Sequence, residues 1–207
     1  AVLTLNMEKP KAESKRALIT GVAGQDGTIL SQALIKDGYS VTGLIKPGTG
    51  ADTLLRYAPE VEILEVELSD QDHMEKTVVG VNPTEIYNFG GISSIVESIA
   101  SPVLTREVNI DSVEAILVGM REVIKGSSGV SPRLVTAASG SIFEGVDRSP
   151  QNEETEPVPN SPYAKSKSEV ISMLRRAREN EGIFATNAIL YNHESPLRGE
   201  GFVTRKI

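Results

Sequence analysis

The sequence predicts an α/β fold in which helices cover both faces of a doubly wound parallel sheet. Three observations predict it: short apolar runs alternate with amphipathic stretches, six such runs follow in this rhythm, and a glycine-rich turn comes after the first. Right-handed crossovers then give the strand order 3-2-1-4-5-6 of a Rossmann-type sheet. We therefore expect the functional residues beyond the carboxyl ends of the strands.

Each element follows from the apolar pattern and from the residues that cap helices. Buried strands are expected over residues 16–20, 39–45, 61–66, 85–89, 134–138 and 184–190. Helices are expected over residues 28–37, 70–79, 102–125 and 161–181. Gly38 suits the end of the first helix, and Asp70 the start of the second. Asn160 or Ser161, followed by Pro162, suits the start of the last.

Composition excludes several classes of function. The chain has no cysteine, so disulfides, a thiol nucleophile and cysteine-bound metals are excluded, and its two histidines give no basis for a metal site. A net charge of −7 argues against nucleic-acid binding, which needs a basic surface. No apolar run reaches about 18 residues, so we expect no membrane span. A cytoplasmic location is the default interpretation.

The glycine-rich turn Gly21-Val-Ala-Gly24-Gln-Asp-Gly27 lies between the first strand and the first helix. Glycines allow a tight turn and a close approach of the backbone to a pyrophosphate, while the helix N-terminus offers free N–H groups and partial positive charge. A plain glycine-rich turn is the alternative. In this position, between a strand and a helix, the pattern favours a dinucleotide-binding corner.

The end of the second strand indicates which dinucleotide is bound. An acidic residue there would hold a ribose 2′-hydroxyl, whereas a basic residue suits a 2′-phosphate. The sequence has Lys46 and no acidic residue in Gly43-Leu-Ile-Lys46-Pro-Gly. We therefore expect NADP rather than NAD, with a solvated surface lysine as the alternative.

Tyr163 and Lys167 are four residues apart at the start of the last helix, so they share one helical face. A lysine ammonium beside a phenol favours the phenolate and makes it a usable base. Ser139, at the end of the fifth strand, would be the third member, with a hydroxyl that binds a substrate oxygen. An ordinary helix N-terminus with an exposed lysine is the alternative interpretation.

This combination of motifs resembles the extended short-chain dehydrogenase/reductase superfamily, and within it the GDP-mannose 4,6-dehydratase family. The resemblance runs from about residue 16 to the end of the chain. Its most specific part is Tyr191-Asn-His-Glu-Ser-Pro196 with the residues that follow it. The segments that carry it are residues 17–27, 85–88, 161–164, 191–196, 198–200 and 202–207.

The resemblance implies an enzyme that binds NADP as an internal hydride relay and makes a 4-keto-6-deoxy sugar nucleotide. Tyr163 would take the sugar 4-hydroxyl proton, a base would remove the proton at C5, and water would leave from C6. The resemblance implies that the cofactor would contact Gly21, Gly24, Gln25, Asp26, Gly27, Lys46, Glu67, Leu68, Phe89, Gly90, Gly91, Ser93, Lys167, His193 and Arg198. The substrate would contact Ser139, Ser141 and Asn192.

The sequence departs from the family pattern in three places. The family has Ser-Thr-Ser-Glu after the fifth strand, whereas this chain has Ala138-Ser139-Gly140-Ser141, which puts serine at the position of the glutamate. Serine does not act as a base at neutral pH unless another group activates it. Glu144, three residues further on, would substitute for the missing glutamate if the loop is remodelled. The cofactor loop is Gly90-Gly-Ile-Ser-Ser94 instead of Ala-Ala-Gln-Ser-His, with Leu104 at a tyrosine position further on. The chain stops at Ile207, where the family continues.

We therefore expect a flexible leader over residues 1–15, an NAD(P)-binding domain over 16–192, and in 193–207 the start of a substrate domain that is mostly absent. The leading hypothesis is a nucleotide-sugar 4,6-dehydratase. An epimerase or reductase is the alternative among enzymes, and a catalytically silent cofactor-binding module the alternative outside them. Relatives in the family suggest a homo-oligomer. Asn109, in the long central helix, either supports the proton relay, as an asparagine does in the superfamily, or lies on an exposed face.

Overall fold

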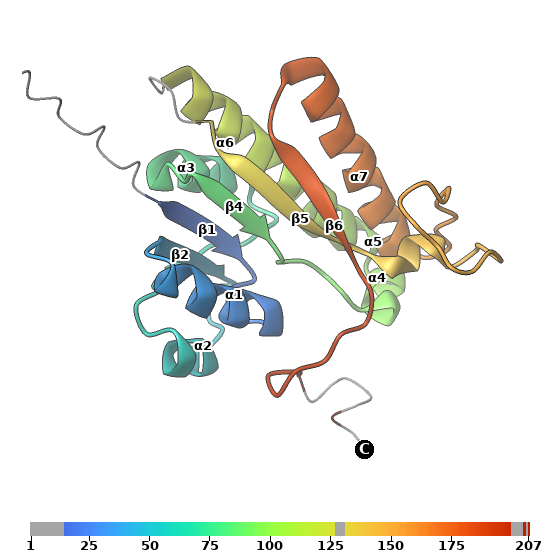
Figure 1. Cartoon of the computed structure of the whole chain (residues 1–207), viewed down its shortest axis with the longest axis horizontal. Helices are drawn as coiled ribbons and strands as arrows, with labels where there is room; N and C mark the ends of the chain where they lie inside the picture. Colours follow the sequence, from blue (N-terminus) through green and yellow to red (C-terminus); the bar gives the residue numbers. More distant parts are fainter. Residues whose placement is uncertain (1–14, 127–130, 200–204, 206) are drawn as a thin grey trace, which may run out of the picture.

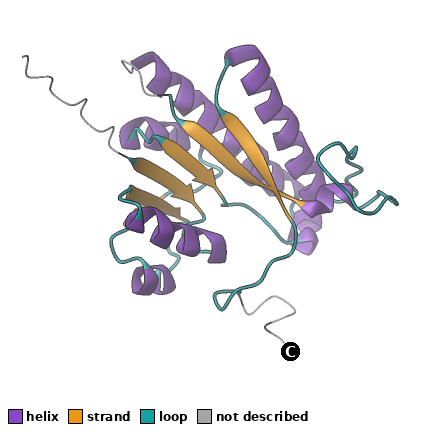
Figure 2. Cartoon of the chain, viewed as in Figure 1, coloured by secondary structure: helices purple, strands orange, loops and turns teal. Residues whose placement is uncertain are grey.

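A computed structural model of the chain describes residues 15–126 and 131–199, together with Arg205 and Ile207. Apart from Lys15, the predicted leader lies outside these residues. One parallel sheet runs through the molecule in the order β3-β2-β1-β4-β5-β6, as predicted (Figures 1 and 2). Its strands are β1 Arg16–Thr20, β2 Ser40–Ile45, β3 Glu62–Glu65, β4 Glu85–Asn88, β5 Arg133–Ser139 and β6 Ala185–Leu190.

The helices form two unequal layers on the sheet. They are α1 Gln25–Lys36, α2 Asp52–Tyr57, α3 Gln71–Val81, α4 Ile95–Ala100, α5 Pro102–Arg106, α6 Ser112–Gly126 and α7 Pro162–Glu181. The larger core cluster joins α3, α6 and α7 to one face, and the smaller one joins α1 and α2 to the other over β1–β3 (Figure 1). The prediction of helices on both faces therefore holds over β1–β3. Over β4–β6 the described helices cover one face.

Capping residues set the helix ends largely as predicted. The Asp70 side chain accepts the backbone N–H of His73 at 3.0 Å, and the Ser161 hydroxyl oxygen accepts that of Ala164 at 3.1 Å. Gly38 follows α1 with a φ of +82°, a conformation that glycine adopts without strain. The start of α1 was predicted three residues too late, because a glycine inside the first turn of a helix hides the helical pattern.

The chain is helical throughout the one helix predicted over residues 102–125, but the helix contains an irregularity that was not predicted. A π-turn, η1 Glu107–Asp111, separates α5 from α6 and presents Asn109 inward, where it is buried. The apolar stripe alone does not reveal the extra residue of a π-turn. The short helices α2 and α4 and the 3₁₀ turn η2 Gly140–Phe143 were also missed, because one or two turns give too few residues for a periodic pattern.

Within the described residues, no helix is both long enough and apolar enough to cross a membrane.

Candidate active site

The corner between β1 and α1 is built so that backbone lies against backbone. Gly21 has a φ of +65°, and a Cβ there would lie 2.7 Å from the nitrogen of Gly90. A Cβ on Gly27 would lie 2.6 Å from Cα of Val22. The Gly24 N–H donates to the Gly21 carbonyl at 3.0 Å, which closes the turn ahead of α1. The corner therefore has no room for side chains at Gly21 and Gly27, and such close backbone packing ahead of a helix N-terminus suits a diphosphate.

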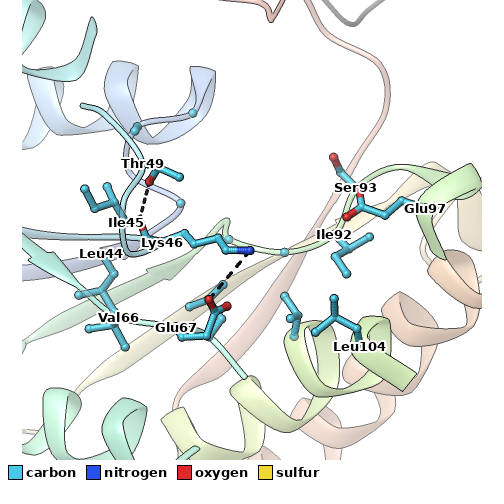
Figure 3. Close-up of a pocket in the computed structure, with 17 residues that line it drawn as sticks. Leu44, Ile45, Lys46, Thr49, Val66, Glu67, Ile92, Ser93, Glu97 and Leu104 are labelled. Atoms are coloured by element: carbon cyan, nitrogen blue, oxygen red, sulfur yellow. Dashed lines mark hydrogen bonds and ion pairs between the residues drawn. The ribbon is translucent and has the colours of Figure 1, made fainter. Parts of the chain in front are cut away.

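A cleft of about 380 Å³ opens beside this corner at the carboxyl ends of β1, β2 and β4 (Figure 3). On one side Lys46 reaches Glu67, with Nζ and Oε2 4.0 Å apart. The other side is formed by the segment after β4, where Ser93 and Glu97 lie, and by Leu104 of α5. The cleft is mixed in character, with apolar walls and an ion pair at its edge.

The predicted cofactor residues lie in several parts of the structure, and about half of them line the cleft. The cleft is lined by Gly21, Gly24, Lys46, Glu67, Leu68, Gly90, Gly91 and Ser93. Phe89 lies elsewhere: its ring packs 6.3 Å from that of Tyr87, on the side of the smaller core cluster. Gly27 is buried within α1. Gln25, Asp26, His193 and Arg198 lie in or against the segment that follows β6, whereas Lys167 lies on α7 and bonds to β5.

Residues 191–198 form a clasp, the segment that fastens onto the N-terminus of α1. His193 Nε2 lies 2.8 Å from Oδ1 of Asp26, and the hydroxyl of Ser195 donates to Oε1 of Gln25 at 2.8 Å. The backbone carbonyl of Tyr191, 2.7 Å from Nδ1, and then the carboxylate of Asp26 raise the pKa of His193. The clasp therefore carries a histidine whose protonated form is favoured by its surroundings.

Two other predicted residues belong to the clasp. Arg198 is half-buried, and its guanidinium lies 3.5 Å from the carboxylate of Glu194. Asn192 is exposed.

Asn109 ties the loop after β4 to α7. Its Oδ1 accepts the N–H of Ile92 at 2.8 Å, and its amide group donates to the carbonyl of Ile92 at 3.0 Å and to the hydroxyl of Ser166 at 3.1 Å. A Cβ on Gly91 would lie 2.7 Å from Oδ1 of Asn109, so the loop approaches this side chain closely. The exposed alternative is therefore wrong, and the residue links the wall of the cleft to the helix of Tyr163.

Tyr163 and Lys167 lie on the same face of α7, as their spacing predicted. Nζ of Lys167 is 5.9 Å from the centroid of the Tyr163 ring and donates to the carbonyl of Ala137 in β5 at 2.8 Å. The lysine is 8% exposed, and desolvation lowers its pKa to about 8. A phenol and a buried ammonium are thus held together at the end of β5.

Ser139 ends β5 and begins the 3₁₀ turn η2. Its side-chain oxygen accepts the N–H of Ser141 at 3.2 Å, which fixes the turn. A Cβ on Gly140 would lie 2.9 Å from the ring of Tyr191, whose hydroxyl donates to Gln151 at 3.0 Å. This contact, which sets an aromatic ring beside the turn, was not predicted. The bond from Lys167 to Ala137 brings α7 within two residues of Ser139.

Among the described residues, no three histidine, aspartate or glutamate side chains gather where they could hold a metal ion. The functional groups at this site are a phenol, an ammonium, hydroxyls and separate carboxylates.

Comparison with known proteins identifies relatives of the whole described chain. A GDP-mannose 4,6-dehydratase from Vibrio cholerae is 36% identical over 207 residues, which cover 93% of this chain and 54% of the relative. GDP-mannose 4,6 dehydratase 2 from Arabidopsis thaliana is also 36% identical, over 96% of this chain and 57% of the relative. The chain thus spans about half the length of these curated relatives.

Solved structures share the fold. The UDP-glucose 4-epimerase of Thermus thermophilus, solved as a complex with NAD, has a TM-score of 0.78 and 26% identity, covering 89% of this chain and 58% of that one. The dTDP-glucose 4,6-dehydratase of Streptomyces venezuelae has a TM-score of 0.79 at 20% identity, over 92% and 60%. The profile of the family described as GDP-mannose 4,6 dehydratase matches residues 18–207. The chain therefore belongs to the GDP-mannose 4,6-dehydratase family.

Proposed function

We propose that the protein acts on a GDP-hexose as a 4,6-dehydratase, removing water from GDP-mannose with a nicotinamide cofactor. The observation that carries the proposal is the pairing of Tyr163 with a buried Lys167 at the end of β5. It occurs beside a glycine corner suited to a diphosphate, in a chain of this family. The proposed activity is that of the whole protein to which this chain corresponds.

The residues present fit a dinucleotide. The corner at Gly21 and Gly27 has no room for side chains, and the N–H groups at the start of α1 would bind a diphosphate. The cleft beyond it would take the adenosine end, with Lys46 positioned for a 2′-phosphate. When bound, the nicotinamide accepts a hydride from the sugar and later returns it.

The chain's own residues would handle the proton at C4. The Tyr163 phenolate would take the proton of the sugar 4-hydroxyl, and the ammonium of Lys167 would stabilise the negative charge on the phenolate. Ser139 would hydrogen-bond to the same sugar oxygen. Ser141 and Asn192 are placed as further substrate contacts in this proposal, because they flank that end of the sheet.

The test is to incubate the protein with GDP-mannose and NADP and to follow the product by mass spectrometry. We expect a 4-keto product that has lost one water. Lys167→Met should reduce its rate of formation by about 100-fold or more. Reduction of the nicotinamide, or inversion at C4, without loss of water would instead favour a reductase or an epimerase. This is the second candidate function, because Ser141 stands where the family has a glutamate. Cofactor binding with no turnover would favour a silent module.

Cofactor choice is tested separately by equilibrium titration. We expect NADP to bind more tightly than NAD, because the Lys46 ammonium is 69% exposed and free to turn from Glu67 toward a 2′-phosphate. Lys46→Ala should lower the affinity for NADP and leave that for NAD unchanged. Lys76→Ala, on the exposed side of α3, is the control. Equal affinities of the wild type for both nucleotides would contradict the assignment of Lys46.

We also infer a homo-oligomer. Three apolar side chains stand out from α4 and α5: Val96 is 78% exposed, Ile99 62% and Val103 70%. Adjacent apolar groups of this size favour burial against another surface. Light scattering should give a mass larger than one chain, and Val96→Ser with Val103→Ser should lower it. A monomeric wild type would contradict this proposal.

A further inference from the structure

Dehydration needs a proton carrier that the residues named so far do not supply. Ser139, Tyr163 and Lys167 serve the oxygen on C4. Removal of water across C5 and C6 requires a second group that takes a proton from C5 and delivers one to the C6 hydroxyl. Ser141 has a hydroxyl, which is not a base at neutral pH unless another group activates it. The inference below rests on the proposed function and concerns this second group.

Glu144 lies one 3₁₀ turn beyond Ser141. Its N–H donates to the Ser141 carbonyl at 3.1 Å, the i to i+3 bond of such a turn. Side chains three residues apart on a 3₁₀ helix eclipse each other. Glu144 therefore stands on the same side of η2 as Ser141, and its longer side chain is exposed.

The carboxylate of Glu144 is held at the start of the helix that carries Tyr163. The hydroxyl of Ser161 donates to Oε1 of Glu144 at 3.5 Å, while its oxygen caps α7 by accepting the N–H of Ala164. A negative charge at a helix N-terminus is stabilised by the helix dipole. Ser161 is two residues before Tyr163, so the Glu144 carboxylate is bonded to the turn of chain that carries the phenol.

Backbone bonds fix this arrangement. The N–H of Val158 donates to the carbonyl of Ile142 at 2.9 Å. The carbonyl of Val158 accepts the N–H of Gly145 at 3.0 Å. These two bonds pin the segment around Glu144 to the segment that leads into Ser161. The distance between η2 and the start of α7 is thus set by the backbone rather than by the side chains alone.

Other carboxylates near this edge are engaged elsewhere. Asp26 pairs with His193, and Glu194 lies 3.5 Å from Arg198. Glu97 lines the nucleotide cleft. Glu144, in contrast, is bonded to the cap of α7.

We propose that Glu144 is the acid–base group for elimination of water. Its carboxylate takes the proton from C5 of the 4-keto sugar, and the C5–H electron pair forms the C5=C6 double bond. The C6–O bond breaks, and the oxygen leaves as water with the proton that Glu144 had taken. No external oxidant is needed, because the elimination itself is redox-neutral.

The experiment separates hydride transfer from water loss in Glu144→Gln. Nicotinamide absorbance during a single turnover with GDP-mannose and NADP reports oxidation at C4, and mass spectrometry of the sugar nucleotide reports loss of water. We expect oxidation within about twofold of the wild type and water loss slowed by about 100-fold or more. Glu144→Asp should restore part of the water loss, because it keeps a carboxylate.

The control is Glu153→Gln, which removes the same charge from an exposed position in the neighbouring loop. It should leave both signals unchanged, and thermal melting of each variant checks the fold. Water loss at the wild-type rate in Glu144→Gln would overturn the inference while the proposed function stands. A wild type that never reduces the nicotinamide would overturn both.

Discussion

The half of the sheet formed by β1–β3 and the half formed by β4–β6 are built in different ways. The first half lies between α1 and α2 on one face and α3 on the other, and its carboxyl edge depends on glycines at which backbone meets backbone. The second has α6 and α7 on one face, and individual side-chain bonds from Asn109, Lys167 and Ser161 hold its edge. The first half is therefore specified by missing side chains and the second half by particular ones.

The largest effect is expected from Gly27→Ala in the first half. The new Cβ would lie 2.6 Å from Cα of Val22 and 2.7 Å from the carbonyl oxygen of Gly21, and neither backbone atom can turn aside. We expect a loss of about 3 kcal/mol in the free energy of unfolding, measured in urea, and weakened uptake of dinucleotide. Alanine favours helix, so propensity would act in the opposite direction.

Gly50→Ala is the control for this change, because a Cβ there meets no atom within 4 Å. Equal stability of the two variants would show that the corner can relax, and would remove the contrast between the halves.

In the second half, Lys167→Met should change how stability depends on pH. Burial lowers the pKa of Lys167 from 10.5 to about 8, so between these values the unfolded chain holds a proton that the folded chain has released. The unfolding free energy then rises with pH across this window, by up to about 3 kcal/mol. Unfolding of both proteins from pH 7 to 11 should show the extra slope in the wild type. Identical slopes would contradict the assigned burial.

Asn109→Ala should cost about 2 kcal/mol, because it leaves the N–H and carbonyl of Ile92 without their side-chain partner in a buried place. Chemical unfolding measures the loss, with Asn180→Ala on the exposed end of α7 as the control. Losses of equal size would mean that the π-turn does not depend on its asparagine.

The smallest effect is expected where the two halves meet, in Asp26→Asn. Without this carboxylate the pKa of His193 should fall, yet stay above its ordinary value because the carbonyl of Tyr191 remains. Protonated His193 holds the clasp, so the bond to Asp26 weakens as pH rises through the folded pKa. Titration by NMR measures the change, and Asp72→Asn, in the first turn of α3, is the control. An unchanged His193 titration would show that the clasp is open in solution.

The sequence was informative where a local rule decides the structure. The strand order and the caps at Asp70 and Ser161 were predicted because alternation and capping act over a few residues. The common face of Tyr163 and Lys167 follows from helical spacing, and the structure confirms it. Their chemical roles, like those of the other predicted site residues, stay predictions.

Other features depend on contacts that no local pattern records. Asn109 looks like any polar residue in a helix until the π-turn directs it at Ile92. The clasp joins Asp26 to His193 across 167 residues of chain, which only the tertiary fold brings together. The bond between Glu144 and Ser161 likewise depends on where the loop between η2 and α7 returns to the sheet.

The clasp also has a consequence for how the protein is made. During synthesis the β1–α1 corner leaves the ribosome long before its partner, because His193 follows Asp26 by 167 residues. At about 5–20 residues per second, the corner waits roughly 10 to 30 s for that partner. A nascent chain halted before β6 would therefore carry the glycine turn with Gln25 and Asp26 exposed to solvent.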